Sequence, residues 1–291
     1  MHNNIVVFDD LKLPDIGNTR YKYHTPINYF CRIPNHFIQQ NITEQYGLNR
    51  IFLVVYLLID RHKTLENKSY LSIGHVLRIC GYSTGKRKPS QFYEIMKSLL
   101  FLKKNYFIEV DFDMKNMEYD TLLEIKIIEE NFIPENNFTK LYGRDFDLIM
   151  KMKTKTLKEN ILLCFVYILS YIEDNHSKKE DSCDSVHDTS PHAFFQSISN
   201  ISKNLSMSKN TIVKCMEHLT THTDYHNSLL IKKEAGSIYC HMSKEPKNIP
   251  NIYVLNKKGY RQEINLALEE IKKIYGVKSF EPLIKNKRNN T

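Results

Sequence analysis

Residues 201–212 read Ile-Ser-Lys-Asn-Leu-Ser-Met-Ser-Lys-Asn-Thr-Ile, and this stretch decides the fold that the sequence predicts. Leu205 ends one short helix, and Ser208 stands where its hydroxyl can accept hydrogen bonds from the free amides of the next helix. Leu205 and Met207 can bury the turn between the two helices against Ile212. The stretch therefore predicts two helices joined by a tight, apolar turn.

This stretch resembles the helix-turn-helix core of bacterial DNA-binding proteins, in which the helix after the turn enters the major groove. The resemblance implies that polar residues at the start of that helix meet base edges and phosphates. The residues expected to contact DNA here are Ser208, Lys209, Asn210, Thr211 and Lys214. The alternative is an ordinary capped helix in a protein-interaction domain.

The surrounding sequence of the second half fits the same interpretation. A strongly apolar helix is expected over Asn160–Ile172, upstream of the turn. Two β-like runs, Leu229–Lys233 and Ile252–Leu255, follow it and can pair around a long tip. Three helices followed by a β-hairpin are the order of a winged helix. The tip would be the wing, and we expect its Lys244 and Lys247 to contact DNA.

The first half has the same order of elements. Ile51–Asp60 is apolar nearly all round, which predicts a buried helix. Ser72 can cap a second helix that stops at Gly81, and a third begins at Pro89. Two β-like runs follow, residues 106–112 and 121–128. We therefore expect an α+β, mainly α protein made of two tandem winged-helix domains joined by a helical connector.

The third helix of the first half is preceded by a basic turn. Cations at the start of such a helix suit phosphate contacts, and a glutamine there can bind adenine bidentately. The residues expected to contact DNA are Lys86, Arg87, Lys88, Ser90, Gln91 and Lys97. A solvated lysine face is the alternative. The tip of the following hairpin is acidic, so we expect it to face protein rather than DNA; its acids are Asp111, Asp113, Glu118 and Asp120.

These patterns divide the chain into five parts. Residues 1–45 are expected to be an extended arm, and residues 46–135 the first winged helix. Residues 136–192 are the connector and a mobile polar loop, which covers 173–192, although Asn160–Ile172 already belongs to the second domain. The rest of the second winged helix covers 193–275, and 276–291 is a basic tail. We expect each domain to have a core of its own, with Leu57 in the first and Leu163 in the second.

Composition narrows the function classes. The net charge is +8 at pH 7, which favours an anionic partner, although an AT-rich coding sequence also enriches lysine. The sequence shows no phosphate-binding loop, dinucleotide fingerprint or zinc-protease motif, so we expect no enzymatic activity, no cofactor and no metal. The six cysteines are scattered, which indicates reduced thiols. The start lacks the pattern of a signal peptide, so we expect a cytoplasmic protein without a membrane segment.

The start of the first domain also resembles a known family. Residues 29–34 read Tyr-Phe-Cys-Arg-Ile-Pro, and the helix that follows ends with Tyr-Leu-Leu-Ile-Asp-Arg at 56–61. This is similar to the N-terminal winged helix of the replication initiator A family of plasmids. The resemblance covers roughly residues 29–110. The chain departs from the family by its basic turn at 86–89 and by a full second winged helix.

Resemblance to that family implies binding to repeated origin DNA, followed by melting or helicase recruitment. The function we expect is sequence-specific binding of double-stranded DNA, in replication initiation of a plasmid or mobile element. A transcriptional regulator of the same architecture is one alternative, and a helicase-loading or primosome-type adaptor is another. A homodimer and replication proteins, such as a helicase or its loader, are the protein partners considered.

Overall fold

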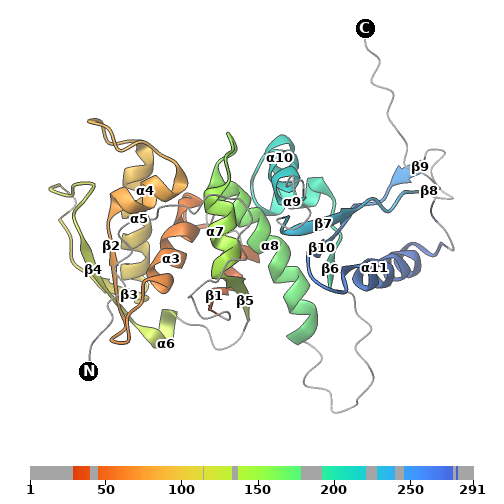
Figure 1. Ribbon diagram of the computed structural model, residues 1–291, viewed down its shortest axis with the longest axis horizontal. Coiled ribbons are helices and arrows are strands. Elements are labelled where there is room, and N and C mark those ends of the chain that lie inside the picture. The colour runs from red at the N-terminus through yellow and green to blue at the C-terminus, as the bar shows by residue number, and fades with distance from the viewer. Residues whose placement is uncertain are drawn as a thin grey trace, which may run out of the picture.

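The computed structural model describes residues 29–39, 45–113, 115–132, 137–177, 192–220, 228–239, 246–277 and 280. It is an α+β protein, as the sequence predicts, and its elements are arranged in two units along the longest axis (Figure 1). Among the helices of these residues, none combines the length and the apolar character needed to cross a membrane. Lys244 and most of the expected arm and tail lie outside the described residues.

The first unit contains the three predicted helices and the predicted hairpin. In chain order its elements are α3 (Ile51–Arg61), β2 (Lys68–Leu71), α4 (Ile73–Cys80), α5 (Ser90–Lys104), β3 (Ile108–Val110) and β4 (Leu123–Ile127). The strands form an antiparallel sheet in the order β2-β4-β3. Ser72 caps α4, with its hydroxyl 3.2 Å from the amide of His75, and Gly81 ends that helix at φ +86°. Strand β2 was not predicted, since four residues are too short for a pattern.

The second unit has the same connectivity. Its elements are α8 (Lys158–Ser177), β6 (Ala193–Phe194), α9 (Ile198–Asn204), α10 (Lys209–Thr220), β7 (Leu230–Lys233) and β10 (Ile252–Leu255). The sheet order β6-β10-β7 again places the last strand in the middle. The predicted pairing of the two runs is confirmed, with Leu230 opposite Leu255. The tip between them carries a second ribbon, β8 (Ser237–Tyr239) paired with β9 (Pro246–Asn248), and α11 (Tyr260–Tyr275) follows.

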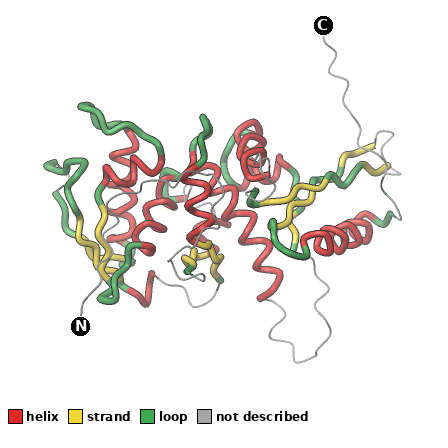
Figure 2. The backbone as a smooth tube through the Cα atoms, in the orientation of Figure 1, coloured by secondary structure: helices red, strands yellow, loops and turns green. Residues whose placement is uncertain are grey.

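A small layer lies between the two units and corrects the expected extended arm. Strand β1 (Phe30–Pro34) pairs with β5 (Phe138–Tyr142) across more than a hundred residues of sequence. Helix α1 (Asn35–Gln39) follows β1, and α7 (Gly143–Lys151) follows β5, while the short α6 (Glu129–Phe132) precedes it. Figure 2 shows this two-stranded ribbon below the central helices. Residues 30–39 are therefore part of the packed core, because Ile33 and Phe37 are buried.

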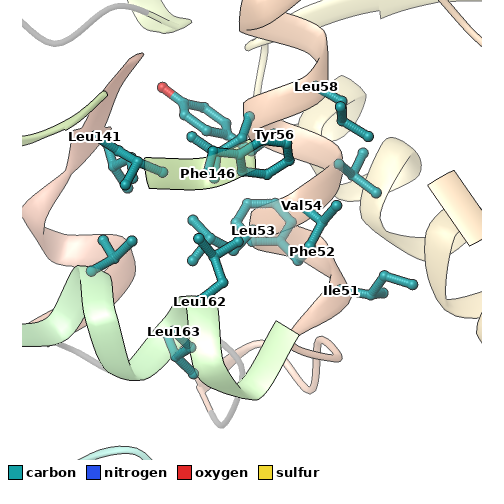
Figure 3. Close-up of a cluster of buried hydrophobic side chains, with 14 of the residues drawn as sticks. Ile51, Phe52, Leu53, Val54, Tyr56, Leu58, Leu141, Phe146, Leu162 and Leu163 are labelled. Carbon is teal, nitrogen blue, oxygen red and sulfur yellow. The ribbon is translucent and has the colours of Figure 1, made fainter. Parts of the chain in front are cut away.

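One hydrophobic core runs through both units, which differs from the expectation of two separate cores. The cluster includes Leu57 of α3, Leu163 of α8 and Ile212 of α10. Figure 3 shows part of this core: Leu162 of α8 faces Leu53 and the other α3 side chains, and Leu141 and Phe146 line the same space. Helices apolar on every side can bury one face in their own unit and another in the neighbouring unit. The predicted reduced state is confirmed for the four described thiols, which are free and buried: Cys31, Cys80, Cys164 and Cys215.

The sheet of the second unit is covered on both faces. Phe194, Leu230 and Tyr253 belong to the large core, whereas Ile252 and Val254 join a smaller cluster with α11. Part of the expected tail also packs there, since Phe280 lies against this smaller cluster. At the other boundary, α8 continues to Ser177, so residues 173–177 are helical rather than part of the expected mobile loop. The remaining loop residues up to 191 lie outside the described ranges.

Candidate nucleic-acid interface

The turn between α9 and α10 folds as the sequence indicates. Leu205 and Met207 are buried, and Ser206 between them adopts a left-handed conformation with φ +46°. The amide of Met207 donates to the carbonyl of Ser202 at 3.0 Å, which closes the turn. The hydroxyl of Ser208 accepts from the amide of Thr211 at 3.1 Å, so the predicted N-cap is confirmed.

Helix α10 buries one face and exposes the start of the other. Ile212, Cys215, Met216 and Leu219 form the buried face. Lys209, Asn210 and Lys214 are exposed, and within the described part of the chain neither lysine forms an ion pair. Thr211 is different, because it is half-buried and its hydroxyl lies 2.8 Å from that of Ser208. The predicted residues of α10 thus lie together, with Ser208 and Thr211 occupied in the cap.

At the start of α5, the cations expected to contact DNA lie in a different environment from the lysines of α10. Lys88 Nζ donates to the carbonyl of Met117 at 2.6 Å and forms an ion pair with Glu118 at 3.0 Å. It also lies 5.0 Å from the centre of the Phe92 ring. The first hairpin therefore already supplies an acidic partner, Glu118, for the charge of Lys88. Lys86 and Arg87 are exposed, and neither forms an ion pair with a described residue.

The other predicted residues of α5 are dispersed. Lys97 Nζ donates to the carbonyl of Gly47 at 2.5 Å, beside α3 rather than at the helix start. Gln91 is half-buried, and its side-chain carbonyl accepts a hydrogen bond from the Ser90 hydroxyl at 3.2 Å. The Gln91 side chain is also hydrogen-bonded to the Tyr82 hydroxyl. An amide held in this way must break existing bonds before it can contact a base. The α5 residues thus do not share one free face, unlike those of α10.

The acidic tip of the first hairpin folds back on its own unit. The carbonyl of Tyr119 accepts from the amide of Gly74 in α4 at 2.7 Å, and the Tyr119 ring packs on Phe92 with centres 5.3 Å apart. Two acids of the tip pair with cations of the helices: Glu118 with Lys88, and Asp120 with Arg78. The expectation that this wing faces another protein gains no support, since the wing contacts α4 and α5.

Two polar contacts connect the units next to these helices. The Arg50 guanidinium, at the start of α3, donates to the carbonyl of Ser206 in the α9–α10 turn at 2.7 Å. The Tyr82 hydroxyl donates to the carboxylate of Glu159, which is 2% exposed at the start of α8. Burial, and then this hydrogen bond, raise the pKa of Tyr82, so the phenol keeps its proton and donates. Both contacts fix one unit against the other.

The tip of the second hairpin, which the sequence predicts to be a wing, is only partly described. Lys247 lies in β9, where it is paired in register with Ile238, and its side chain is outside what the structure describes. Sequence reasoning also gave no role to three exposed lysines at the end of α7 and in the loop that follows: Lys151, Lys153 and Lys155. The feature of the sequence that could have indicated them is the alternation of lysine with Met152 and Thr154. In the ranges described, no group of three or more metal-ligating side chains is present.

No family model matches the chain. No curated protein matches it significantly.

Proposed function

We propose that this chain binds double-stranded DNA, with α10 as the helix that enters the major groove. We also propose that both units are winged helices. The support for this is their shared connectivity: a helix, a strand, two helices and two strands, with the last strand central in the sheet. In such a unit the third helix is the one that contacts bases. The third helices here are α5 and α10.

The observation that carries the proposal is the contrast between these two helices. Each has a lysine at its start: Lys88 lies two residues before Ser90, the first residue of α5, and Lys209 is the first residue of α10. Lys88 is neutralised by Glu118, whereas Lys209 and Lys214 have no acidic partner among the described residues. Unpaired cations at a rigid helix start attract phosphates, because binding releases the counterions that DNA has condensed. The geometry therefore favours α10 as the main DNA-contacting helix and leaves α5 a supporting role through Lys86 and Arg87.

We further propose that this binding serves replication initiation of a plasmid or mobile element. The two segments that resemble the replication initiator A family are in contact in the fold. The Tyr29 hydroxyl donates to the carbonyl of Asp60 at 2.9 Å, and the Tyr56 hydroxyl donates to that of Arg32 at 3.1 Å. The two segments therefore pack together as one substructure in this chain. A regulator would use the same DNA surface, and binding to repeats beside the chain's own coding sequence would favour the initiator.

The test of DNA binding is charge reversal on α10. We expect the wild-type chain to bind a random-sequence duplex at low salt, followed by fluorescence anisotropy. Lys209→Glu combined with Lys214→Glu should weaken binding and reduce the slope of log K against log salt by about 1.8, because each phosphate contact contributes about 0.9. Retention of wild-type affinity and slope by this double variant would contradict the proposal.

The matched control is Arg261→Glu combined with Lys273→Glu on α11. Both residues are exposed, and the change in net charge is the same. Helix α11 packs on the opposite face of the β6-β10-β7 sheet from the large core that holds α10 (Figure 1). The control variant should therefore lose little DNA affinity, because salt screens the attraction between the duplex and charges that lie far from it.

A further inference from the structure

Residues 151–157, the last residue of α7 and the loop to α8, carry a strong positive charge that the proposed function has not used; this segment is called the α7–α8 loop. Lys151, Lys153 and Lys155 are exposed, while the intervening Met152 is buried and Thr154 is half-buried. None of the three lysines forms an ion pair with any residue that the structure describes. The nearest acids in sequence are occupied: Asp147 holds Arg61 in a bidentate pair, and Glu159 is buried. The loop is therefore a local excess of cations.

One side of this loop is fastened to α10. The Nε2 atom of His218 lies 2.7 Å from the hydroxyl of Thr154 and 3.2 Å from that of Thr156. His218 follows Lys214 by four residues, so the two side chains lie on the same face of the helix. The lysines of the loop consequently adjoin the face of α10 that carries Lys214.

The other side of the loop leads to the first unit. Lys158, directly after it, donates to the carbonyl of Ile79 at 3.2 Å, at the end of α4. Tyr82 donates to Glu159 just beyond. The chain then continues from Tyr82 to the exposed Lys86 and Arg87. Figures 1 and 2 show the α4–α5 loop, the α7–α8 loop and α10 on the same upper side of the molecule.

We propose that the α7–α8 loop is a third phosphate-binding element, which joins the basic turn of the first unit and α10 of the second into one surface for a single DNA duplex. This inference rests on the proposed DNA binding and adds to it. A duplex is the occupant that fits, because its backbone presents regularly spaced negative charges over a long distance. A small anion could contact only one of the three segments. The loop residues are lysines without a fixed planar fork, so they would bind phosphates rather than specify bases.

The test uses the full-length chain with Lys151→Gln, Lys153→Gln and Lys155→Gln combined. The probe is a random-sequence duplex of three helical turns, about 30 base pairs. The slope of log K against log salt should fall by about 2.7, or about 0.9 for each lysine. Between about 50 and about 200 mM salt, the wild type should then lose about 40-fold more affinity than the variant.

The control is Lys257→Gln, Lys258→Gln and Lys273→Gln, three exposed lysines near and on α11 with the same change in charge. Both triple variants should melt at the wild-type temperature, since all the altered side chains are exposed. Equal slopes for the loop variant and the control, with the α10 double variant still defective, would overturn this inference and leave DNA binding standing. Absence of any duplex binding by the wild type would overturn both.

Discussion

At the scale of single residues, the same side chain has different uses in the two units. Lys88 and Lys209 both stand at the start of a third helix. Lys88, however, donates hydrogen bonds to the carbonyl of Met117 and to the carboxylate of Glu118. An exposed ion pair of this kind contributes only about 0–1 kcal/mol to stability, so its main consequence is to occupy the lysine. Lys209 has no such partner within the described ranges, and its neighbour Asn210 is equally exposed.

Asn210 provides the test at this scale. It is short, uncharged and exposed next to the cap, so it contributes little to nonspecific attraction. If it contacts a base, Asn210→Ala should cost about 1–3 kcal/mol on the preferred site and almost nothing on random DNA. Lys214→Ala should weaken both about equally, since its contribution is to counterion release. Competition between specific and random duplex at two salt concentrations measures the ratio, and an unchanged ratio for Asn210→Ala would assign specificity elsewhere.

At the scale of elements, the first hairpin is a docked segment and not a free wing. Its tip reaches α4, where a Cβ atom on Gly74 would lie 2.9 Å from the carbonyl oxygen of Tyr119. Met117, nearby in the tip, is 3% exposed. The absence of a side chain at position 74 therefore allows the close approach of helix and tip.

Gly74→Ala tests this docking. Alanine favours the helix by about 1 kcal/mol, but the contact with a backbone oxygen forces a shift that costs about 1–3 kcal/mol. We expect a net loss of up to about 2 kcal/mol in urea unfolding. Gly85→Ala is the matched control, because a Cβ there meets nothing closer than the Ser83 hydroxyl at 3.7 Å. If Gly74→Ala were as stable as Gly85→Ala, the tip would not be docked as described.

At this scale, the sequence could predict the features that depend on residues close together in the chain. The helix cap at Ser208 and the pairing of residues 229–233 with 252–255 depend on local pattern, and the structure has both. The docking of residue 119 on residue 74 and the pairing of Cys31 with Leu141 join distant segments. Periodicity describes which face of an element is apolar, but it does not identify the remote partner that covers that face.

At the scale of the whole molecule, the two units are joined by packing and by polar contacts. The large core passes from α3 to α8 and α10, and Arg50 reaches the α9–α10 turn. The candidate site could be predicted in part, since α10 is where the sequence located it. The contribution of residues 151–157 could not, because it depends on the contact of Thr154 with His218 in another element. The shared core joins the two units into one packed body.

The most direct test of double-stranded DNA binding through α10 is selection of bound duplexes from a random pool by the full-length chain. The account predicts retention of duplex at low salt and enrichment of one sequence, longer than a single helical turn of about 10 base pairs because both units face the same duplex. The Lys209→Glu, Lys214→Glu variant should retain less duplex from the same pool and enrich no sequence. Failure of the wild-type chain to retain any duplex at low salt would contradict the account.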